Sequence, residues 1–443
     1  MKQFRAHLIV RTLLIVGGKE MRKLLSILSL VALLAMASAQ GTRAQNAPTW
    51  MIQRAERQVI VDDIVHYQFV VAIGPGQYDK IRIHRVVRES HPFQPAQLSQ
   101  AVMFVSGEPT YFTLYLEPSI SKATPRDHAI AIYLAKNDID VWGMDYRWAL
   151  VPEDTTDFSF MEGWGAKTDV ADSQIALSIA RRLRGGLFQP SGPLYLAGLS
   201  YGAQITYAVA ANDTQRPPAL RNVKGIIPMD YGVLFNDADY QAENCGYLPG
   251  ILSGPIYSDN RAYWQIGQLA LSNPNDISPF DPTGTYTNYQ FALGVGAWPN
   301  ESIAWHFVGG WFDQNGTPYD LRYTAPRLWL DLLIHNEPPY YPTLIDYETG
   351  SVVCAGKVAD DSYAGHLGEV KVPILYVGAA GGIGRYGEYT TTVTASKDVT
   401  IHIVQVQPDD QRMVDYGHGD LLTARDAQFL VWERILSWLK AHR

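Results

Sequence analysis

A chain of 443 residues is long enough to bury a large core, as one domain with an insertion or as two domains. Its formal net charge of −8 argues against nucleic acid and anionic membranes as partners, because both repel a negative surface. Two cysteines occur, Cys245 and Cys354, and the sequence leaves open whether they pair as a disulfide or stay free thiols.

The first 39 residues follow the three-part plan of a secretory signal peptide. A basic pair, Arg22 and Lys23, precedes an apolar run over 24–36, and small residues fill positions 37–39. The apolar run is short for a bilayer-spanning helix, and no later run is long enough to span a membrane. The sequence therefore predicts a mature chain that starts near Gln40 and is secreted or periplasmic.

Short apolar runs separated by turn or helix signals recur along the rest of the chain. Stretches such as VMFV and PLYLAG are continuously apolar, as in strands buried on both faces of a parallel sheet. The first two runs have no helical segment between them, so we expect an antiparallel start. The predicted strands are Gln58–Ile73, Lys80–Arg88, Ser99–Ser106, Ile139–Asp145, Pro193–Leu199, Val223–Met229, Ile374–Gly378 and Val399–Val406.

Helical patterns fall between these runs, at Val170–Leu183, Ala203–Ala210 and Ala424–Leu439. Strands that alternate with helices predict an α/β protein with a mostly parallel, eight-stranded sheet flanked by helices. Residues 231–369 break this rhythm and are rich in Tyr, Trp, Pro, Asn and Gly. We interpret them as a large cap insertion between strands 6 and 7, with residues 40–230 and 370–443 forming the core.

Gly198-Leu199-Ser200-Tyr201-Gly202 matches the pattern G-x-S-x-G. Glycines two before and two after a serine allow a very tight strand-to-helix turn that exposes the hydroxyl. An apolar strand leads into this motif and a helical pattern comes after it, so backbone N–H groups and the helix dipole would face Ser200. Ser200 is the predicted nucleophile.

A serine hydroxyl needs a base within reach, and His418 is the best match. It lies in a glycine-flanked loop between the last predicted strand and the last predicted helix, where a side chain can reach over the sheet. His366 is the main rival, but it precedes a strand. A carboxylate must then orient the imidazole. We predict Asp230, at the end of Val223–Met229, with Glu388 as the alternative acid.

Three segments make the chain resemble the α/β-hydrolase superfamily: the GLSYG turn, the strand end Asp140–Arg147 (DVWGMDYR), and the GHGDLL loop after the last strand. The acid-lipase branch is the nearest within it, loosely. The resemblance implies an oxyanion hole made by the N–H groups of Tyr201 and of Glu108 or Gly107. One departure is that Ser-Gly-Glu-Pro stands after the third strand, where the family usually has His-Gly.

These residues predict an exported serine hydrolase that cleaves a carboxylic ester through an acyl-enzyme, acting on a small-molecule or lipid-like acyl substrate without cofactor or metal. A peptidase or amidase of the same fold is the alternative, and a catalytically silent extracellular binding module is an alternative of another class. Gly382–Gly387 also spells G-x-G-x-x-G, a dinucleotide-binding pattern. Because β-branched residues dominate Thr390–Thr394 and open a helix poorly, we favour a glycine-rich loop at the border of the site.

Overall fold

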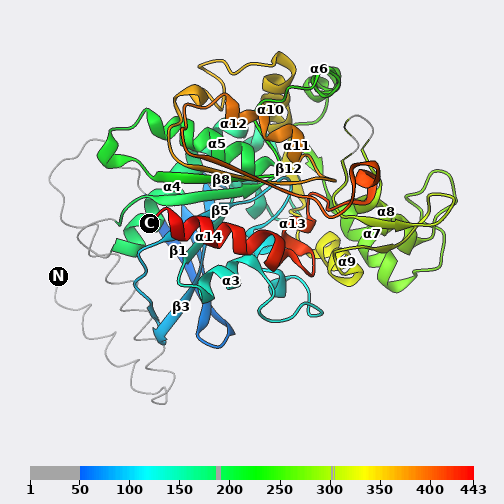
Figure 1. The fold of residues 1–443 in the computed structure, drawn as a ribbon, viewed down its shortest axis with the longest axis horizontal. Coiled ribbons are helices and arrows are strands. Elements are labelled where there is room, and N and C mark those ends of the chain that lie inside the picture. Colours follow the sequence, from blue (N-terminus) through cyan, green and yellow to red (C-terminus); the bar gives the residue numbers. More distant parts are fainter. Residues whose placement is uncertain (1–49, 186–190, 301–302, 304) are drawn as a thin grey trace, which may run out of the picture. The chain divides into compact units, whose positions relative to one another are not determined.

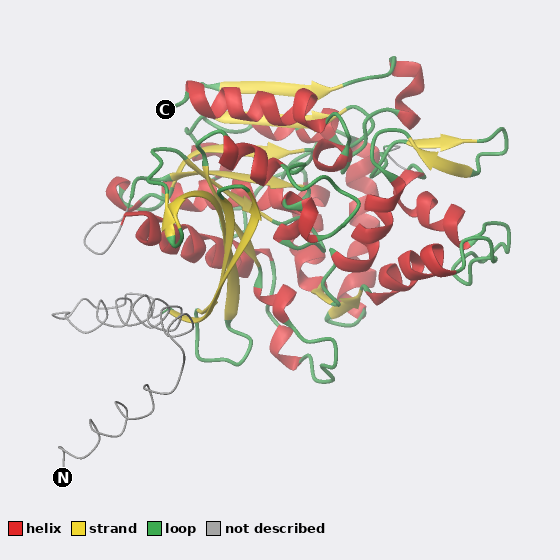
Figure 2. Ribbon diagram, turned by 90° about the horizontal axis from the view of Figure 1, so that it is seen from below, coloured by secondary structure: helices red, strands yellow, loops and turns green. Residues whose placement is uncertain are grey.

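A computed structural model describes residues 50–185, 191–300, 303 and 305–443, which belong to one compact unit, Trp50–Arg443. The predicted signal peptide lies outside the described residues. A ten-stranded sheet forms the centre of this unit, and helices cover it (Figures 1 and 2). This arrangement confirms the predicted α/β class.

The sheet follows the order β1-β2-β3-β6-β5-β7-β8-β13-β14, with β4 paired to β3. Pairing is antiparallel from β1 to β6 and parallel from β6 to β14, as the sequence led us to expect. The strands are β1 Met51–Val61, β2 Ile64–Ala72, β3 Lys80–His91, β4 Gln94–Pro95, β5 Ala101–Val105, β6 Asp140–Asp145, β7 Leu194–Leu199, β8 Val223–Met229, β13 Ile374–Ala379 and β14 Val399–Val404.

The prediction of one long strand over Gln58–Ile73 is wrong, because that segment turns back on itself. Asp62 has a φ of 52° and links β1 to β2 as a tight hairpin. Aspartate tolerates this left-handed conformation better than most residues. The hairpin and the two-residue β4 raise the sheet to ten strands rather than the expected eight.

Two hydrophobic clusters cover opposite faces of the sheet. Along β5, Val102 and Phe104 belong to one cluster and Met103 and Val105 to the other, the period-two alternation of a strand buried on both faces. Helices α4 (Ala166–Gly185) and α5 (Tyr201–Thr214) pack on the second face, and α3 (Ile130–Lys136) and α14 (Glu433–Ala441) pack on the first.

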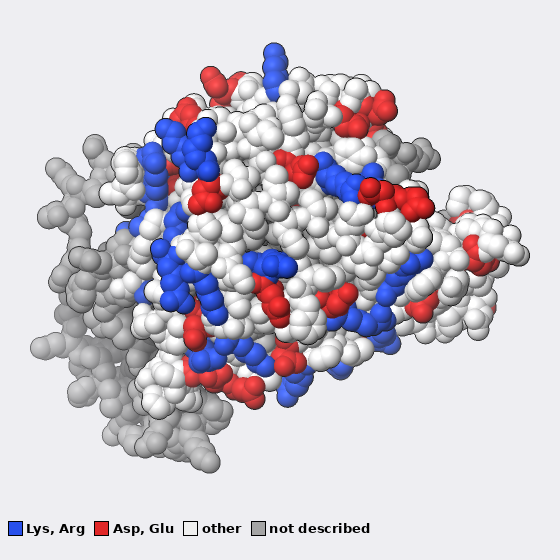
Figure 3. All heavy atoms as spheres, in the orientation of Figure 1, with Lys and Arg blue, Asp and Glu red and all other residues white. Residues whose placement is uncertain are grey.

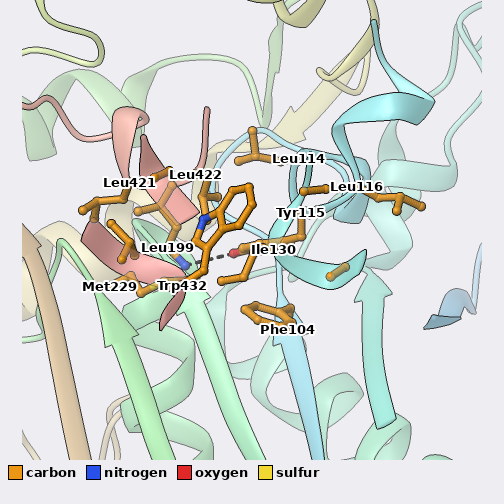
Figure 4. Close-up of a cluster of buried hydrophobic side chains, with 14 of the residues drawn as sticks. Phe104, Leu114, Tyr115, Leu116, Ile130, Leu199, Met229, Leu421, Leu422 and Trp432 are labelled. Atoms are coloured by element: carbon orange, nitrogen blue, oxygen red, sulfur yellow. Dashed lines mark hydrogen bonds between the residues drawn. The ribbon is translucent and has the colours of Figure 1, made fainter. Parts of the chain in front are cut away.

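The first cluster joins the ends of two strands that lead to the predicted site (Figure 4). The hydroxyl of Tyr115 donates to the carbonyl of Val105 at 3.0 Å and accepts from the N–H of Leu199 at 3.0 Å. The ring of Phe104 packs against that of Tyr115 at a tilt of 35°, with ring centroids 4.6 Å apart. Tyr115 thereby holds the ends of β5 and β7 in fixed register.

The predicted helix Ala424–Leu439 differs at its start. Helix α13 covers Asp420–Thr423, and Ala424 is then extended, with a ψ of 147°. A backbone bridge to Thr324 pulls Ala424 out of helical geometry. The helix resumes as a π-helical turn at Gln428–Trp432 and continues into α14.

Residues 230–373 form a folded insertion between β8 and β13, and the predicted cap region, 231–369, falls within it. Helices α7, α8 and α9 contact one another, and α6 packs on α10 (Figure 1). Its elements are α6 Ala238–Ser253, β9 Tyr257–Asp259, α7 Arg261–Ser272, α8 Asn288–Ala297, β10 Gly310–Phe312, β11 Pro318–Leu321, α9 Pro326–His335, β12 Tyr340–Pro342 and α10 Thr343–Ala355.

Cys245 of α6 and Cys354 of α10 are joined by a disulfide. Replacing both by serine should lower thermal stability strongly. The bond spans 109 residues, and closing a loop of about that length stabilises a fold by roughly 4–5 kcal/mol in the chain-entropy model. Differential scanning calorimetry would measure the loss in the double variant. As a second test of the same bond, the wild type would be measured with and without a reductant. An unchanged melting temperature in both samples would contradict this role.

No helix among the described residues is long and apolar enough to cross a membrane. On the face shown in Figure 3, Lys and Arg side chains are interspersed with Asp and Glu. This face therefore carries charge of both signs, although the chain as a whole is acidic.

Candidate functional site

Ser200 lies on the sharp turn between β7 and α5. Its φ of 61° and ψ of −128° are strained for a residue with a side chain. A Cβ atom on Gly198 would lie 2.4 Å from the carbonyl oxygen of Gly202, and one on Gly202 would lie 2.5 Å from the carbonyl oxygen of Val105. The turn therefore requires both glycines, which explains why a serine in this position is flanked by them.

Gly202→Ala should disrupt this turn. The added methyl group would displace β5 or the start of α5, and overpacking of this kind costs about 1–3 kcal/mol or more. We expect a lower denaturant midpoint together with a loss of Ser200 reactivity. Gly246→Ala is the control, because nothing lies within 4 Å of its added Cβ. Equal stability of the two variants would show that the turn is less tight than described.

The structure brings His418 and Asp230 together. Nδ1 of His418 donates to Oδ2 of Asp230 at 2.7 Å, and both side chains are buried. Asp230 directly follows β8 and has a φ of 51°. The N–H groups of Ala379 and Ile383 donate to its carboxylate at 2.6 and 3.0 Å. These bonds hold the carboxylate in place and compensate for its burial.

The glycine-rich loop after β13 wraps around this carboxylate. Cβ atoms on Gly382 and Gly384 would lie 2.1 and 2.7 Å from the two oxygens of Asp230. The loop continues into α11 (Gly384–Gly387) and α12 (Tyr389–Thr392). These glycines, which lack a Cβ atom, therefore leave room for the carboxylate of Asp230 at the end of the neighbouring strand β8. Glu388 is half-buried and, together with Arg385, lines a second pocket that does not include Asp230 or His418.

The insertion fixes the backbone of the His418 loop. The N–H of His418 donates to the carbonyl of His306 at 3.0 Å, and the N–H of Gly419 donates to that of Phe307 at 2.6 Å. The rings of Trp305 and Phe307 each lie 5.5 Å from the imidazole and meet it edge to face. The sequence analysis missed these aromatic neighbours, because their proximity arises only in the fold.

Asp420 also holds the His418 loop in place through hydrogen bonds. Its carboxylate accepts from the N–H groups of Gly309 and Gly417 at 2.8 and 2.9 Å, and from the hydroxyl of Thr324 at 2.6 Å. Burial raises the pKa of Asp420 to about 7. Asp420 thus links the insertion to the loop that carries His418.

The loop after β5 lies directly against Ser200. A Cβ atom on Gly107 would be 3.3 Å from the Cβ of Ser200 and 2.9 Å from the carbonyl oxygen of Leu199. Within the described part of the chain, the N–H groups of Gly107, Glu108 and Tyr201 have no hydrogen-bond partner. They are thus available to an oxygen atom bound beside Ser200.

Tyr201 is anchored beneath the turn. Its hydroxyl donates to Asp169 at 2.9 Å, and the indole N–H of Trp148 donates to the same carboxylate oxygen at 3.1 Å. Burial and the nearby Asp169 carboxyl raise the pKa of Tyr201. The side chain of Tyr201 therefore stays neutral and points away from the reacting region, while its N–H remains beside Ser200.

The side chain of Glu108 faces the insertion. It lies at the wall of a cavity, so its exposed surface faces that cavity. Its carboxyl contacts Asp346 of α10 and Tyr341 of β12. Burial, with a contribution from Asp346, raises the pKa of Glu108, and burial raises that of Asp346 to about 6. Two neighbouring carboxyls of this kind hold a shared proton more readily than two charges.

The other predicted groups lie elsewhere. His366 is on the surface, with Nδ1 3.0 Å from Oε1 of Glu369, and does not meet the Ser200 turn. Among the described residues no group of three or more His, Cys, Asp or Glu side chains is arranged to hold a metal ion. The site thus gathers a strained serine, a histidine–aspartate pair and unpaired N–H donors.

Solved structures share this arrangement of strands and helices. A protein from Sulfolobus solfataricus that is proposed to be a lipase aligns with a TM-score of 0.60 and 20% identity, over 90% of this chain and all of its own. The chain has the α/β-hydrolase fold. The alignment therefore confirms the fold that the sequence resemblance implied.

Two other solved structures align with lower TM-scores. An epoxide hydrolase mutant from Vigna radiata has a TM-score of 0.46 and 13% identity, over 86% of this chain and 98% of its own. The thioesterase domain of the curacin biosynthetic pathway has a TM-score of 0.40 and 12% identity, over 88% and 100%. No family model and no curated protein sequence matches this chain.

Proposed function

We propose that the protein is an exported serine hydrolase that cleaves carboxylic esters. The observation that carries this proposal is the buried 2.7 Å bond between His418 and Asp230. Asp230 lies next to the strained Ser200 turn in the fold, because the N–H of Ser200 donates to the carbonyl of Met229, the residue before Asp230, at 3.0 Å. Nδ1 of His418 is occupied by the carboxylate, which leaves Nε2 as the basic atom of a neutral imidazole. Serine, histidine and carboxylate then have the roles of a catalytic triad.

In the proposed reaction, Oγ of Ser200 attacks the acyl carbon while Nε2 of His418 takes its proton. Asp230 stabilises the imidazolium that forms. The protonated imidazole then gives its proton to the leaving alkoxide, and the acyl group stays on Ser200. Water, deprotonated by the same His418, releases the acid and restores the enzyme.

The negative oxygen of the tetrahedral intermediate would lie between the N–H of Tyr201 and those of Gly107 and Glu108. Fixed donors aimed at a developing oxyanion are worth about 3–4 kcal/mol of barrier each. Burial raises the pKa of both Glu108 and Asp346, and a proton held between these two carboxyls would limit repulsion of this oxyanion.

A panel of p-nitrophenyl esters and matched p-nitroanilides tests the reaction class. We expect the purified protein to hydrolyse the esters with a much higher kcat/KM than the anilides, because p-nitrophenolate leaves without protonation whereas the aniline nitrogen needs a proton to leave. Faster anilide hydrolysis would point to an amidase instead. Turnover of neither class by a folded protein would favour the binding module.

Export is part of the proposal and rests on the N-terminal sequence pattern. Expression of the full chain in a bacterial host should deliver it outside the cytoplasm with a new N-terminus near Gln40. Edman sequencing or intact mass would measure that end. Accumulation of the uncut chain in the cytoplasm would contradict export.

A further inference from the structure

A cavity of about 350 Å³ lies next to the reacting groups. One end of it is formed by Glu108, which follows Gly107 in the loop beside Ser200. Another part is formed by Trp305, whose ring contacts His418. A substrate held at Ser200 would therefore have this cavity beside it, within reach of one of its two substituents.

Aromatic rings and two carboxyl groups line this cavity. The aromatic residues come from separate parts of the insertion, and the carboxyls come from the loop after β5 and from the residue pair after α9. The side chains in question are Tyr263, Trp298, Trp305, Trp329, Glu108 and Glu337. No Lys or Arg is among the described residues that line it.

Glu337 is the least compensated of these groups. Its Oε2 atom is buried and has no hydrogen-bond partner in the described chain. Burial alone raises its pKa well above the ordinary range. The pKa of Tyr263 is also raised, by burial and by the charges of Glu337 and Glu108. A buried carboxyl without a partner is costly, so an uncompensated one at a cavity wall points to a ligand.

His306 adds an acceptor to the same wall. Its Nε2 donates to the carbonyl of Asp415 at 2.8 Å, and burial lowers its pKa, so the ring is neutral. Nδ1 is then an acceptor, and it has no partner among the described residues. Together with the negative faces of the indole rings, the described residues around the cavity offer electron-rich surfaces and no Lys or Arg side chain.

We propose that this cavity binds a substituted ammonium group of the substrate, an inference that rests on the ester hydrolysis proposed above. The indole and phenol faces would surround the alkyl groups of the cation, and the carboxylate of Glu337 would balance its charge. The preferred substrates are then esters that carry a positive charge on one side of the scissile bond. An uncharged group of the same shape would leave Glu337 without compensation.

Choline and its uncharged isostere 3,3-dimethylbutan-1-ol test this assignment by binding alone. Titration calorimetry and tryptophan fluorescence on the wild-type protein should show choline binding at least about tenfold more tightly, as expected for a desolvated cation on aromatic faces. Glycerol serves as a hydroxyl-rich probe and should bind no better than the alcohol. Equal or weaker binding of choline than of either neutral probe would overturn the proposal.

Two further measurements assign the effect to Glu337. Glu337→Gln should remove most of the tenfold preference. Glu117→Gln should keep it, because Glu117 is another buried glutamate whose Oε2 atom has no hydrogen bond among the described residues, and it does not line the cavity. In the wild type, choline but not the alcohol should release a proton, measured by calorimetry in two buffers of different ionisation enthalpy. An unchanged preference in Glu337→Gln, or choline binding without proton release, would overturn the role of Glu337.

These binding results do not depend on turnover. If choline binds selectively but no ester is cleaved, the cation site stands and the proposed hydrolysis fails. If esters are cleaved but butyrylcholine has no higher kcat/KM than 3,3-dimethylbutyl butyrate, and choline shows no selective binding, the hydrolysis stands and the cation site fails.

Discussion

Replacing Ser200 by alanine is expected to lower kcat/KM for an ester by at least about 10⁴-fold, as seen when the nucleophile of a serine hydrolase is removed. The covalent path disappears with Oγ, and His418 has no hydroxyl to deprotonate. The fold should be retained, because the strained turn depends on Gly198 and Gly202 rather than on the hydroxyl. Steady-state kinetics with a p-nitrophenyl ester measures the loss.

Ser272→Ala is the matched control for Ser200→Ala. Ser272 is exposed at the end of helix α7, and among the described residues its hydroxyl donates to the carbonyl of Gln268. Kinetics of this variant should equal those of the wild type. Residual activity of Ser200→Ala above about one hundredth of the wild type would mean that another group attacks the substrate.

Asp230→Asn should lower kcat by about 10⁴-fold with little change in KM. The asparagine keeps the volume of the side chain, but its amide can stabilise neither the required tautomer of His418 nor the imidazolium. It would also exchange one acceptor oxygen for a donor that faces the N–H of Ala379 or Ile383. Circular dichroism should show an intact fold, so that the loss is assigned to catalysis.

Glu388→Gln separates the two candidate acids. Glu388 lines a hollow with Arg385 and does not contact His418 in the described structure. We expect near wild-type kinetics for this variant. A larger loss in Glu388→Gln than in Asp230→Asn would reject Asp230 as the residue that orients the histidine.

The parts of the fold that the sequence predicted well are those set by local pattern. The strands β7 and β8 match their predicted ranges within a residue, because an apolar run buried on both faces leaves little choice of conformation. The Ser200 turn was partly recognisable for the same reason, because Gly198 is required by a contact with Gly202, only a few residues away in sequence. Gly202 is required by the carbonyl oxygen of Val105, on a strand distant in sequence.

Other features depend on contacts between distant residues. The bridge from Thr324 to Ala424 breaks the last predicted helix, and no pattern near Ala424 signals it. Trp305 reaches His418 across more than a hundred residues of sequence. The position of Glu337 at a cavity wall depends on residues from several elements that are distant in sequence. Such features cannot be read from periodicity, because tertiary packing decides them.

The glycine-rich loop after β13 is an intermediate case. The sequence predicted a glycine-rich loop at the border of the site, but the group that the glycines approach was not apparent. The structure shows Gly382 and Gly384 against the carboxylate of Asp230, which follows the neighbouring strand β8. An unusual run of glycines where a triad acid is usually expected was therefore a signal that the acid comes from elsewhere.

Labelling of the purified protein with a fluorophosphonate, followed by mass spectrometry, tests the central claim most directly. An activated serine hydroxyl attacks the phosphorus and keeps the adduct, whereas an ordinary hydroxyl does not. We predict a single adduct on Ser200, abolished in Ser200→Ala and strongly slowed in His418→Ala. A well-folded protein without an adduct, or with its adduct on another serine, would contradict the proposed nucleophile.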